Sequence, residues 1–372
     1  MADPSDCEPL GYAAAAWRRA CNTGVLTGLG RRLQALGLSE RAVTQCFGVR
    51  CPGHAPRAFR ARLGRIAASA AKSWPPVFET VPPAAVLPYL FVAGLRLPAE
   101  CVARRVGDDW PLLRELALVS LSADRILAQA TVAILPVGRA LVVSDRADRE
   151  RGRDTALICD DSAFHTIGAV PGRLAGPGRD RAGTRWLDVG TGSGIVPLAR
   201  PGLAGSVLGT DINPRAVAMA RLGAGLSGIS DVTFRVADLW PGTRSDRVPG
   251  DGPWDLITFN APIPDHAILA GGEDEPLYRV GPADLLPRFW AGVGALLAPR
   301  GEVIVHSWQP ESGYPACLNL PGSVSAIRYT PRGVGPAFGL TLWRPDGPDQ
   351  CRSMAVTLTE NASHVTRALL DP

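Results

Sequence analysis

The sequence predicts an α/β fold: a doubly wound, mostly parallel sheet that follows a mainly helical domain and ends in an antiparallel hairpin. Three observations support this prediction. Strand-like runs alternate with helical runs from residue 186, a glycine-rich turn follows the first of these strands, and three strand-like runs without helices between them close the sequence. Such alternation is typical of a parallel sheet covered by helices.

The length and composition predict two domains. The chain has 372 residues, which exceeds the usual domain size of roughly 100–200 residues. The Gly-, Pro- and Arg-rich stretch at 171–185 is typical of a linker or surface loop. We therefore expect an N-terminal accessory domain over residues 1–170 and a second domain over residues 171–372. A net charge of +4 is too small to indicate nucleic-acid binding by itself.

The N-terminal domain shows helical patterns near 11–21, 39–47, 55–73 and 98–118, and Ser39 fits the cap of the second. Two β-rich runs follow, joined at 136–138, and predict a hairpin. Helices followed by a hairpin predict a winged-helix-like unit. Substrate recognition, nucleic-acid binding and plain packing all remain open as its role.

The cysteines and the apolar runs exclude several classes of protein. Only Cys46, Cys51 and His54 approach the spacing of metal ligands, and no second ligand pair follows, so we expect no metal. No run of about 18 residues is free of charge and proline. The first ten residues are acidic where a secretory signal is basic. We expect a cytoplasmic protein without a membrane segment.

The second domain should contain five strands near 185–190, 206–211, 232–236, 254–259 and 301–306, with helices between them. In an open parallel sheet the ligand lies at the carboxyl ends of the strands, where the first strand leads through a glycine turn into a helix. The turn in this sequence is "DVGTGSGI", and its glycines allow a ligand to approach the backbone closely.

The residues around this turn distinguish between two cofactor classes. A dinucleotide fingerprint that starts at Gly190 requires a third glycine at 195, and this position is Ile195. Asp188 precedes the turn, where a carboxylate repels a pyrophosphate but favours the ammonium and sulfonium charges of S-adenosylmethionine. The residue pattern therefore favours S-adenosylmethionine.

Polar residues at the ends of the next strands fit the same cofactor. Asp211, followed by Ile212, ends the second strand, where an acid accepts hydrogen bonds from ribose hydroxyls. Asp238 ends the third strand within reach of the adenine amino group, and Leu239 can cover the ring. Asn260 ends the fourth strand, where the methyl group is presented.

These motifs resemble, in order and spacing, those of the class I S-adenosylmethionine-dependent methyltransferases, over about residues 183–345. The resemblance implies a Rossmann-like methyltransferase sheet and S-adenosylmethionine as the cofactor. The cofactor-binding residues that it implies are Asp188, Gly190, Thr191, Gly192, Gly194, Asp211, Ile212, Asp238, Leu239 and Asn260.

The segment "NAPI" is similar to the N-P-P-Y motif of methyltransferases that act on planar nitrogens, such as release-factor glutamine and rRNA amino-group methyltransferases. In that family the Asn and the following backbone carbonyl bind the target NH2. Asn260 and Pro262 match the motif, whereas Ala261 and Ile263 depart from it and remove the aromatic stacking surface. We take Asn260, Pro262 and His266 as catalytic candidates, since a loop histidine can accept a proton near neutral pH.

Three further segments border the expected site. Ser162, Phe164 or His165, in the segment at 159–168, could cover the methionine end of the cofactor. The insertion at 267–282 could form a substrate lid. His306 and Trp308 end the fifth strand, and Trp308 could line the acceptor pocket or belong to the core.

The sequence alone favours methyl transfer to a nitrogen or oxygen of a small molecule or peptide, as in natural-product tailoring, because the aromatic at 263 is missing and the charge is modest. The alternative is a methyltransferase of the translation apparatus that acts on an rRNA or tRNA base or on a protein glutamine. A third hypothesis is a non-catalytic, cofactor-sensing protein that binds DNA. The oligomeric state is not predicted.

Overall fold

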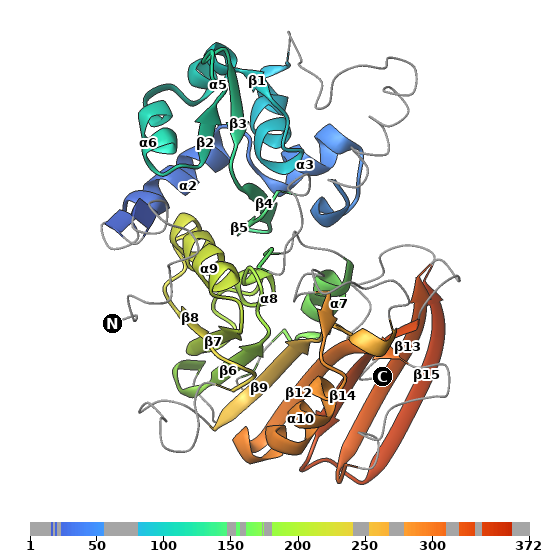
Figure 1. The fold of residues 1–372 in the computed structure, drawn as a ribbon. Coiled ribbons are helices and arrows are strands. Elements are labelled where there is room, and N and C mark those ends of the chain that lie inside the picture. The colour runs from blue at the N-terminus through green and yellow to red at the C-terminus, as the bar shows by residue number, and fades with distance from the viewer. Residues whose placement is uncertain are drawn as a thin grey trace. The chain divides into compact units, whose positions relative to one another are not determined.

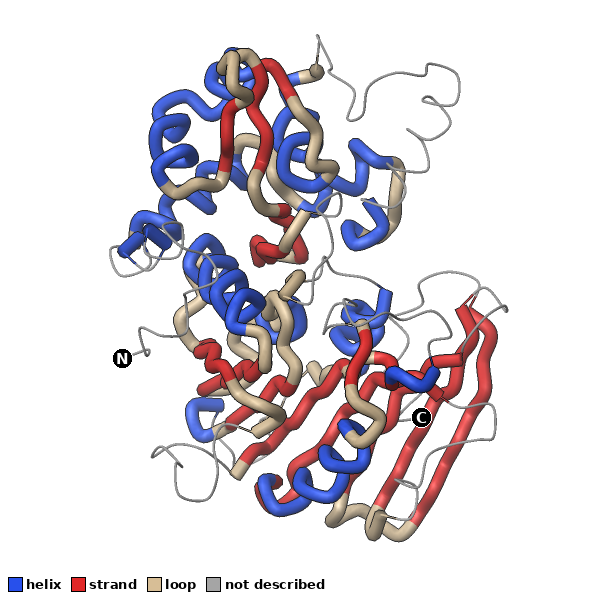
Figure 2. Tube along the Cα trace, in the orientation of Figure 1, coloured by secondary structure: helices blue, strands red, loops and turns tan. Residues whose placement is uncertain are grey.

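The computed structural model describes residues 16–17, 19–20, 24–55, 81–146, 154–156, 161–172, 174, 181–240, 253–267, 279–309, 320–331 and 337–358 (Figures 1 and 2). The chain divides into two compact units. The N-terminal unit contains residues 1–150, 156–160 and 218–230. The C-terminal unit contains residues 151–155, 161–217 and 231–372.

The described part of the N-terminal unit contains the helices α2 (Val25–Ala35) and α3 (Glu40–Phe47). The hydroxyl of Ser39 accepts a hydrogen bond from the backbone N–H of Ala42 at 3.3 Å, so Ser39 caps α3 as the sequence predicts. Gly48 ends the helix in the left-handed conformation, with φ of 65°. The predicted helices at 11–21 and 55–73 lie largely outside the described residues.

A three-stranded antiparallel sheet follows, with the strand order β1-β3-β2. Its strands are β1 (Leu97–Pro98), β2 (Val119–Leu121) and β3 (Leu127–Ala130), and the helices α5 (Ala99–Val106) and α6 (Trp110–Glu115) lie between β1 and β2 in the chain. A helical turn at Pro88–Val92 precedes them. Helix, strand, two helices and a hairpin form a winged-helix-like unit in which residues 122–126 are the wing (Figure 1). The helix predicted at 98–118 is divided in two because Gly107, with φ of 57°, ends α5.

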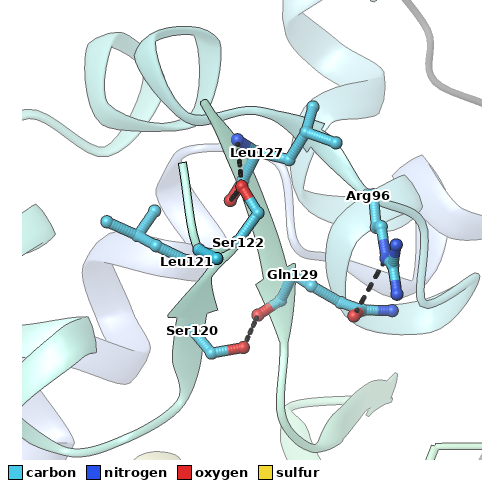
Figure 3. Close-up of a pocket in the computed structure, with 7 residues that line it drawn as sticks. Arg96, Ser120, Leu121, Ser122, Leu127 and Gln129 are labelled. Carbon is cyan, nitrogen blue, oxygen red and sulfur yellow. Dashed lines mark hydrogen bonds between the residues drawn. The ribbon is translucent and has the colours of Figure 1, made fainter. Parts of the chain in front are cut away.

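The predicted hairpin is present as β4 (Ala133–Val137) and β5 (Ala140–Ser144), which turn at Gly138 with φ of 57°. One part of that prediction is wrong. The first of the two β-rich runs in the sequence starts at Ile126, but its residues Leu127–Ala130 form β3 and pair with β1 and β2. A groove of about 300 Å³ lies beside the wing and is lined mainly by Arg96 and by polar side chains of β2 and β3 (Figure 3).

The C-terminal unit contains an eight-stranded sheet of order β15-β13-β14-β12-β9-β6-β7-β8. Its central strands are β6 (Arg185–Val189), β7 (Ser206–Asp211), β8 (Val232–Val236), β9 (Trp254–Asn260) and β12 (Leu297–Gln309), and all five run parallel. They confirm the five strands predicted from the sequence. The short helix α8 (Ile195–Leu198) follows β6, and α9 (Pro214–Ser227) follows β7.

The strand order reverses beside β6. The chain moves outward from β6 through β7 to β8 and then returns to the other side of β6 as β9. In an open α/β sheet, ligands bind in the crevice at such a reversal, outside the carboxyl ends of the strands. The carboxyl ends of β6 and β9 therefore mark the expected site.

The far side of the sheet ends in three further strands, β13 (Ser323–Pro331), β14 (Ala337–Arg344) and β15 (Gln350–Leu358). β14 pairs antiparallel with both β12 and β13, which confirms the predicted antiparallel hairpin. β15 departs from that pattern because it pairs parallel to β13. The turn before β15 passes the start of β13, where Gly322 N–H donates to Asp349 at 2.7 Å.

The two faces of this sheet differ in character. Helix α10 (Leu285–Val293) contributes Phe289 and Val293 to an apolar cluster on one face, with buried residues of β6, β9 and β12. Side chains alternate between the two faces along a strand. The polar residues next to these apolar ones therefore lie on the other face, and they include Asp188, Thr258, Asn260 and His306. Helix α7 (Asp161–Ala169) contacts β9 and β12 and lies on that second face (Figure 2).

Candidate functional site

The glycine loop after β6 has a backbone that requires glycine. Gly190, Gly192 and Gly194 have φ of 58°, 55° and 75°, a region that side chains with a Cβ rarely adopt. The N–H of Thr191 donates to the carbonyl of Thr210 at 2.8 Å, which joins the loop to the end of β7. A Cβ placed on Gly192 would meet nothing within 4 Å, so open space lies beside this part of the loop.

Asp188 faces into the protein beneath this loop. Its carboxylate is 2% exposed and accepts hydrogen bonds from the hydroxyls of Thr191, at 2.6 Å, and Thr258. Burial raises the pKa of Asp188 to about 7, against the lowering effect of the two hydroxyls. The side chain thus ties the loop to β9, and its direct contact with a cofactor stays a prediction.

Asp211, at the end of β7, is held by two backbone groups. Gly192 N–H donates to Oδ2 at 2.8 Å and Asn213 N–H donates to Oδ1 at 2.8 Å. Burial raises the pKa of this carboxyl, and the two N–H groups oppose that effect. A carboxylate has about four acceptor positions, so each oxygen can accept one further donor, such as a ribose hydroxyl. Ile212 beside it is 53% exposed and offers an apolar surface.

Asp238 and Leu239 follow β8. Leu239 has the left-handed φ of 61° and is buried, and its carbonyl accepts a hydrogen bond from the Thr210 hydroxyl at 3.0 Å. Asp238 is exposed, and its Oδ2 pairs with Arg288 of α10 at 2.6 Å. The sequence predicts Asp238 as the end of this strand, whereas β8 ends at Val236, two residues earlier, and the ion pair with Arg288 was not anticipated.

Asn260 ends β9 in a chain of hydrogen bonds between four elements. Its Nδ2 donates to the hydroxyl of Ser162 in α7 at 2.9 Å. Its Oδ1 lies 2.9 Å from Nδ1 of His306 in β12. Nε2 of His306 lies 2.6 Å from the hydroxyl of Tyr329 in β13. Burial and, to a smaller extent, the neighbouring His165 lower the pKa of His306 to about 3, so the ring is neutral.

Aromatic rings surround this chain of hydrogen bonds. His165 lies parallel to His306 at a centroid distance of 6.5 Å and contacts Tyr329 at 4.7 Å. Phe338 of β14 lies 5.8 Å from His306. The sequence reasoning singled out Ser162, His165 and His306 but missed Tyr329 and Phe338, for which the only local signal is an aromatic residue within a strand-like run.

The loop after Asn260 is fixed by a second, two-stranded pairing. β10 (Ile263–Pro264) lies parallel to β11 (Val280–Gly281), and Pro262 packs where a Cβ on Gly281 would clash with it at 2.6 Å. His266 lies in a short helical turn at Asp265–Ala267. The His266 side chain and most of the predicted lid, residues 268–278, lie outside the described residues.

The residues present fit S-adenosylmethionine. The loop has open space beside Gly192, Asp211 keeps acceptor capacity, and Ile212 presents an apolar surface. Above its pKa of about 7, buried Asp188 adds negative potential below the loop, which suits a cationic ligand. Among the described residues, no group of three His, Cys, Asp or Glu side chains could hold a metal ion. None of the described helices is long and apolar enough to cross a membrane.

Comparison with known proteins gives the same assignment. The sequence profile of a methyltransferase family, "Ribosomal protein L11 methyltransferase (PrmA)", matches residues 177–260, from just before β6 to Asn260. A ribosomal protein L11 methyltransferase of Rhizobium etli is 36% identical over 225 residues, which are 57% of this chain and 68% of the relative. A release factor glutamine methyltransferase of Rhodospirillum rubrum is 38% identical over 145 residues, covering 35% of this chain and 42% of the relative.

A solved ribosomal protein L11 methylase from Lactobacillus delbrueckii is 24% identical and has a TM-score of 0.32, covering 49% of this chain and 77% of that one. The hypothesis of a non-catalytic, cofactor-sensing DNA-binding protein has no support among the two sequence relatives, which are both methyltransferases. With its glycine loop, its strand order and a relative matched over more than two thirds of its length, this chain belongs to the ribosomal protein L11 methyltransferase family and is a class I S-adenosylmethionine-dependent methyltransferase.

Proposed function

We propose that this chain transfers a methyl group to a nitrogen of a protein of the translation apparatus. The observation that carries the proposal is the amide of Asn260, fixed at the carboxyl end of β9 by Ser162 and His306. The relatives support the acceptor class, because their names specify a ribosomal protein and a release factor glutamine. The expectation of a small-molecule acceptor gains no support from them, and the translation-apparatus alternative fits better.

For the cofactor, we propose that the glycine loop and the ends of β7 and β8 form one binding surface. Asp211 would accept the ribose hydroxyls, since its carboxylate is already held in place by two backbone N–H groups. Ile212 and Leu239 would pack against the adenine, and Asp238 would meet its amino group. The full set comprises Asp188, Gly190, Thr191, Gly192, Gly194, Asp211, Ile212, Asp238 and Leu239, and Asn260 would border it at the methyl end without contributing much to affinity.

S-adenosylmethionine supplies a methyl group that is activated by a sulfonium, so the protein mainly aligns the acceptor and excludes water. Asn260 would accept an N–H of the acceptor and orient the nitrogen lone pair for in-line attack. The new N–CH3 bond forms as the sulfur–carbon bond breaks, and the acceptor nitrogen loses one proton. Pro262 would shape the acceptor side, and His266 would accept this proton.

We propose that the winged-helix-like unit takes part in recognising the acceptor protein. Its wing carries Ile126, which is 64% exposed. Asp124 accepts a hydrogen bond from the Ile126 N–H at 3.2 Å, and Arg125 has the left-handed φ of 60°. This turn presents an apolar side chain to solvent, where a protein partner could bury it.

The test is transfer of radiolabelled methyl groups from S-adenosylmethionine by the full chain. Purified bacterial ribosomal protein L11, a purified release factor, rRNA and a small-molecule extract serve as separate acceptors, and the Asn260→Ala chain is the control. We expect label in a protein acceptor with the unchanged chain and little with the variant. Label confined to rRNA or to small molecules would overturn the proposed acceptor class.

A further inference from the structure

The hydrogen bonds at Asn260 form a continuous chain that has a direction. Ser162, Asn260, His306 and Tyr329 come from α7, β9, β12 and β13, and three contacts of 2.9, 2.9 and 2.6 Å join them in that order. His306 is 2% exposed and Tyr329 is 5% exposed. Polar atoms buried this deeply need complementary partners, because an unmatched donor or acceptor loses its hydration without compensation.

The chemistry of each group determines the direction of donation. Oδ1 of Asn260 can only accept, so Nδ1 of His306 carries the proton at that contact. A neutral imidazole has a single N–H, so Nε2 is the acceptor and the hydroxyl of Tyr329 donates to it. At the other end, the NH2 of Asn260 donates to Ser162.

A reversed chain would also pair every atom, with the Asn260 amide rotated by a half turn and the proton on Nε2. The short contact of 2.6 Å favours the first direction, because a phenol is a stronger hydrogen-bond donor than a neutral imidazole N–H. The two directions differ in where Asn260 places its carbonyl oxygen. In the first direction the oxygen lies beside His306, and one of its lone pairs remains for a donor from the acceptor molecule.

We propose that His306 and Tyr329 are positioning residues that hold the Asn260 amide in one of its two orientations, with its carbonyl oxygen available to an N–H of the methyl acceptor. The inference rests on the proposed methyl transfer beside Asn260, but it requires no particular acceptor. The fixed carbonyl oxygen would orient such a donor in a site that lacks the aromatic residue at position 263.

The first test reads the proton directly, without an acceptor. The full chain with ¹⁵N-labelled histidine is studied by NMR near neutral pH, where protonated and unprotonated ring nitrogens have well-separated shifts. The His306 signals are identified by their loss in His306→Asn. We expect the proton on Nδ1, and in Tyr329→Phe a shift toward the other tautomer, because the donor to Nε2 is gone. A proton on Nε2 in the unchanged chain would overturn the proposal.

The second test uses rescue by a similar residue. In His306→Asn, an amide NH2 occupies about the place of Nδ1 and can still donate to Asn260, whereas His306→Leu keeps the bulk without a donor. We expect His306→Leu to lower kcat for the protein acceptor about tenfold or more. The Kd for S-adenosylmethionine, measured by calorimetry, should stay within about twofold. His306→Asn should recover most of the lost kcat.

The matched control is Ser307→Ala, which removes a buried hydrogen bond to Gln309 on the other face of the same strand. It should leave kcat near that of the unchanged chain. Equal losses in His306→Leu and His306→Asn would contradict the positioning role. If the unchanged chain methylates neither ribosomal protein L11 nor the release factor, the proposed function fails. The NMR result still decides the orientation of Asn260.

Discussion

The backbone N–H of Gly192 donates to Oδ2 of Asp211 at 2.8 Å and thereby joins the glycine loop to the end of the neighbouring strand. The same carboxylate accepts the N–H of Asn213 through its other oxygen, at 2.8 Å. Asp211 therefore has two roles in one place. It fixes the shape of the loop and keeps acceptor positions for the proposed contact with the ribose.

Replacement of Asp211 by alanine should weaken the binding of S-adenosylmethionine by about 1–3 kcal/mol, because charged hydrogen bonds are lost and Gly192 loses its partner. Calorimetry of both chains measures the difference. Asp231→Ala is a suitable control, because Asp231 also accepts a hydrogen bond from a glycine N–H, that of Gly202 at 3.0 Å. Asp231 directly precedes β8 and thus lies at the amino ends of the parallel strands, away from the proposed site. Equal affinities in all three chains would contradict the assignment of Asp211.

Replacement of Asn260 by alanine should separate binding from turnover. The side chain contacts Ser162 and His306 rather than the glycine loop, so the Kd for S-adenosylmethionine should change little. The methylation rate should fall by about tenfold to a hundredfold, since about 1–3 kcal/mol of orientation is lost. Single-turnover methylation alongside calorimetry checks both quantities. An unimpaired rate would remove Asn260 from the proposed site.

The positions of the strands and the glycine loop were predictable because their signals are local. The glycine loop needs glycine at three positions because its backbone has positive φ at Gly190, Gly192 and Gly194. Asp211 and Asn260 are each the last residue of a strand. In a parallel sheet those ends meet at one edge, so sequence alone brings them together.

The partners of these residues were not predictable, because they depend on pairing between distant strands. Tyr329 reaches His306 only because β14 is inserted between β12 and β13 with a particular register. Asp188 shares a face with Thr258 through the pairing of β6 with β9. Without that register, the sequence could indicate a ligand contact for this carboxylate but not its hydrogen bond to the buried Thr258.

Two glycines in α2 should respond in opposite ways to alanine. A Cβ on Gly30 would lie 1.9 Å from the carbonyl oxygen of Leu226, so Gly30→Ala should destabilise the N-terminal unit by about 1–3 kcal/mol. At Gly28 the nearest atom is the flexible end of Arg32, at 3.1 Å. Gly28→Ala should therefore stabilise the helix by roughly 0.5–1 kcal/mol. Thermal unfolding of the two variants measures both effects, and equal shifts in Tm would contradict the close packing.

Asp188 should make the protein less stable as the pH rises. The pKa of Asp188 is about 7 in the folded chain, against the ordinary value of 3.8 that we take for the unfolded chain. Between these two pH values the folded chain holds a proton that the unfolded chain has released. The free energy of unfolding should fall across this range by at most about 4 kcal/mol from this group. Urea unfolding of Asp188→Asn should lack this contribution. A pH-independent difference between the two chains would count against a neutral, buried Asp188.

His306 should make the protein less stable as the pH falls. Its pKa is about 3 in the folded chain against 6.5 ordinarily, so below pH 6.5 the unfolded chain binds a proton that the folded chain excludes, and stability is lost as the pH falls. The contribution reaches at most about 5 kcal/mol near pH 3. Since Asp188 opposes it between about pH 4 and 6.5, only single variants reveal either effect. Relative to the unchanged chain, His306→Asn should gain stability steadily below pH 6.5 and show a constant difference above it, as measured by urea unfolding. If acidification affects both chains equally, the imidazole is charged in the folded state, and its single-proton link to Asn260 is wrong.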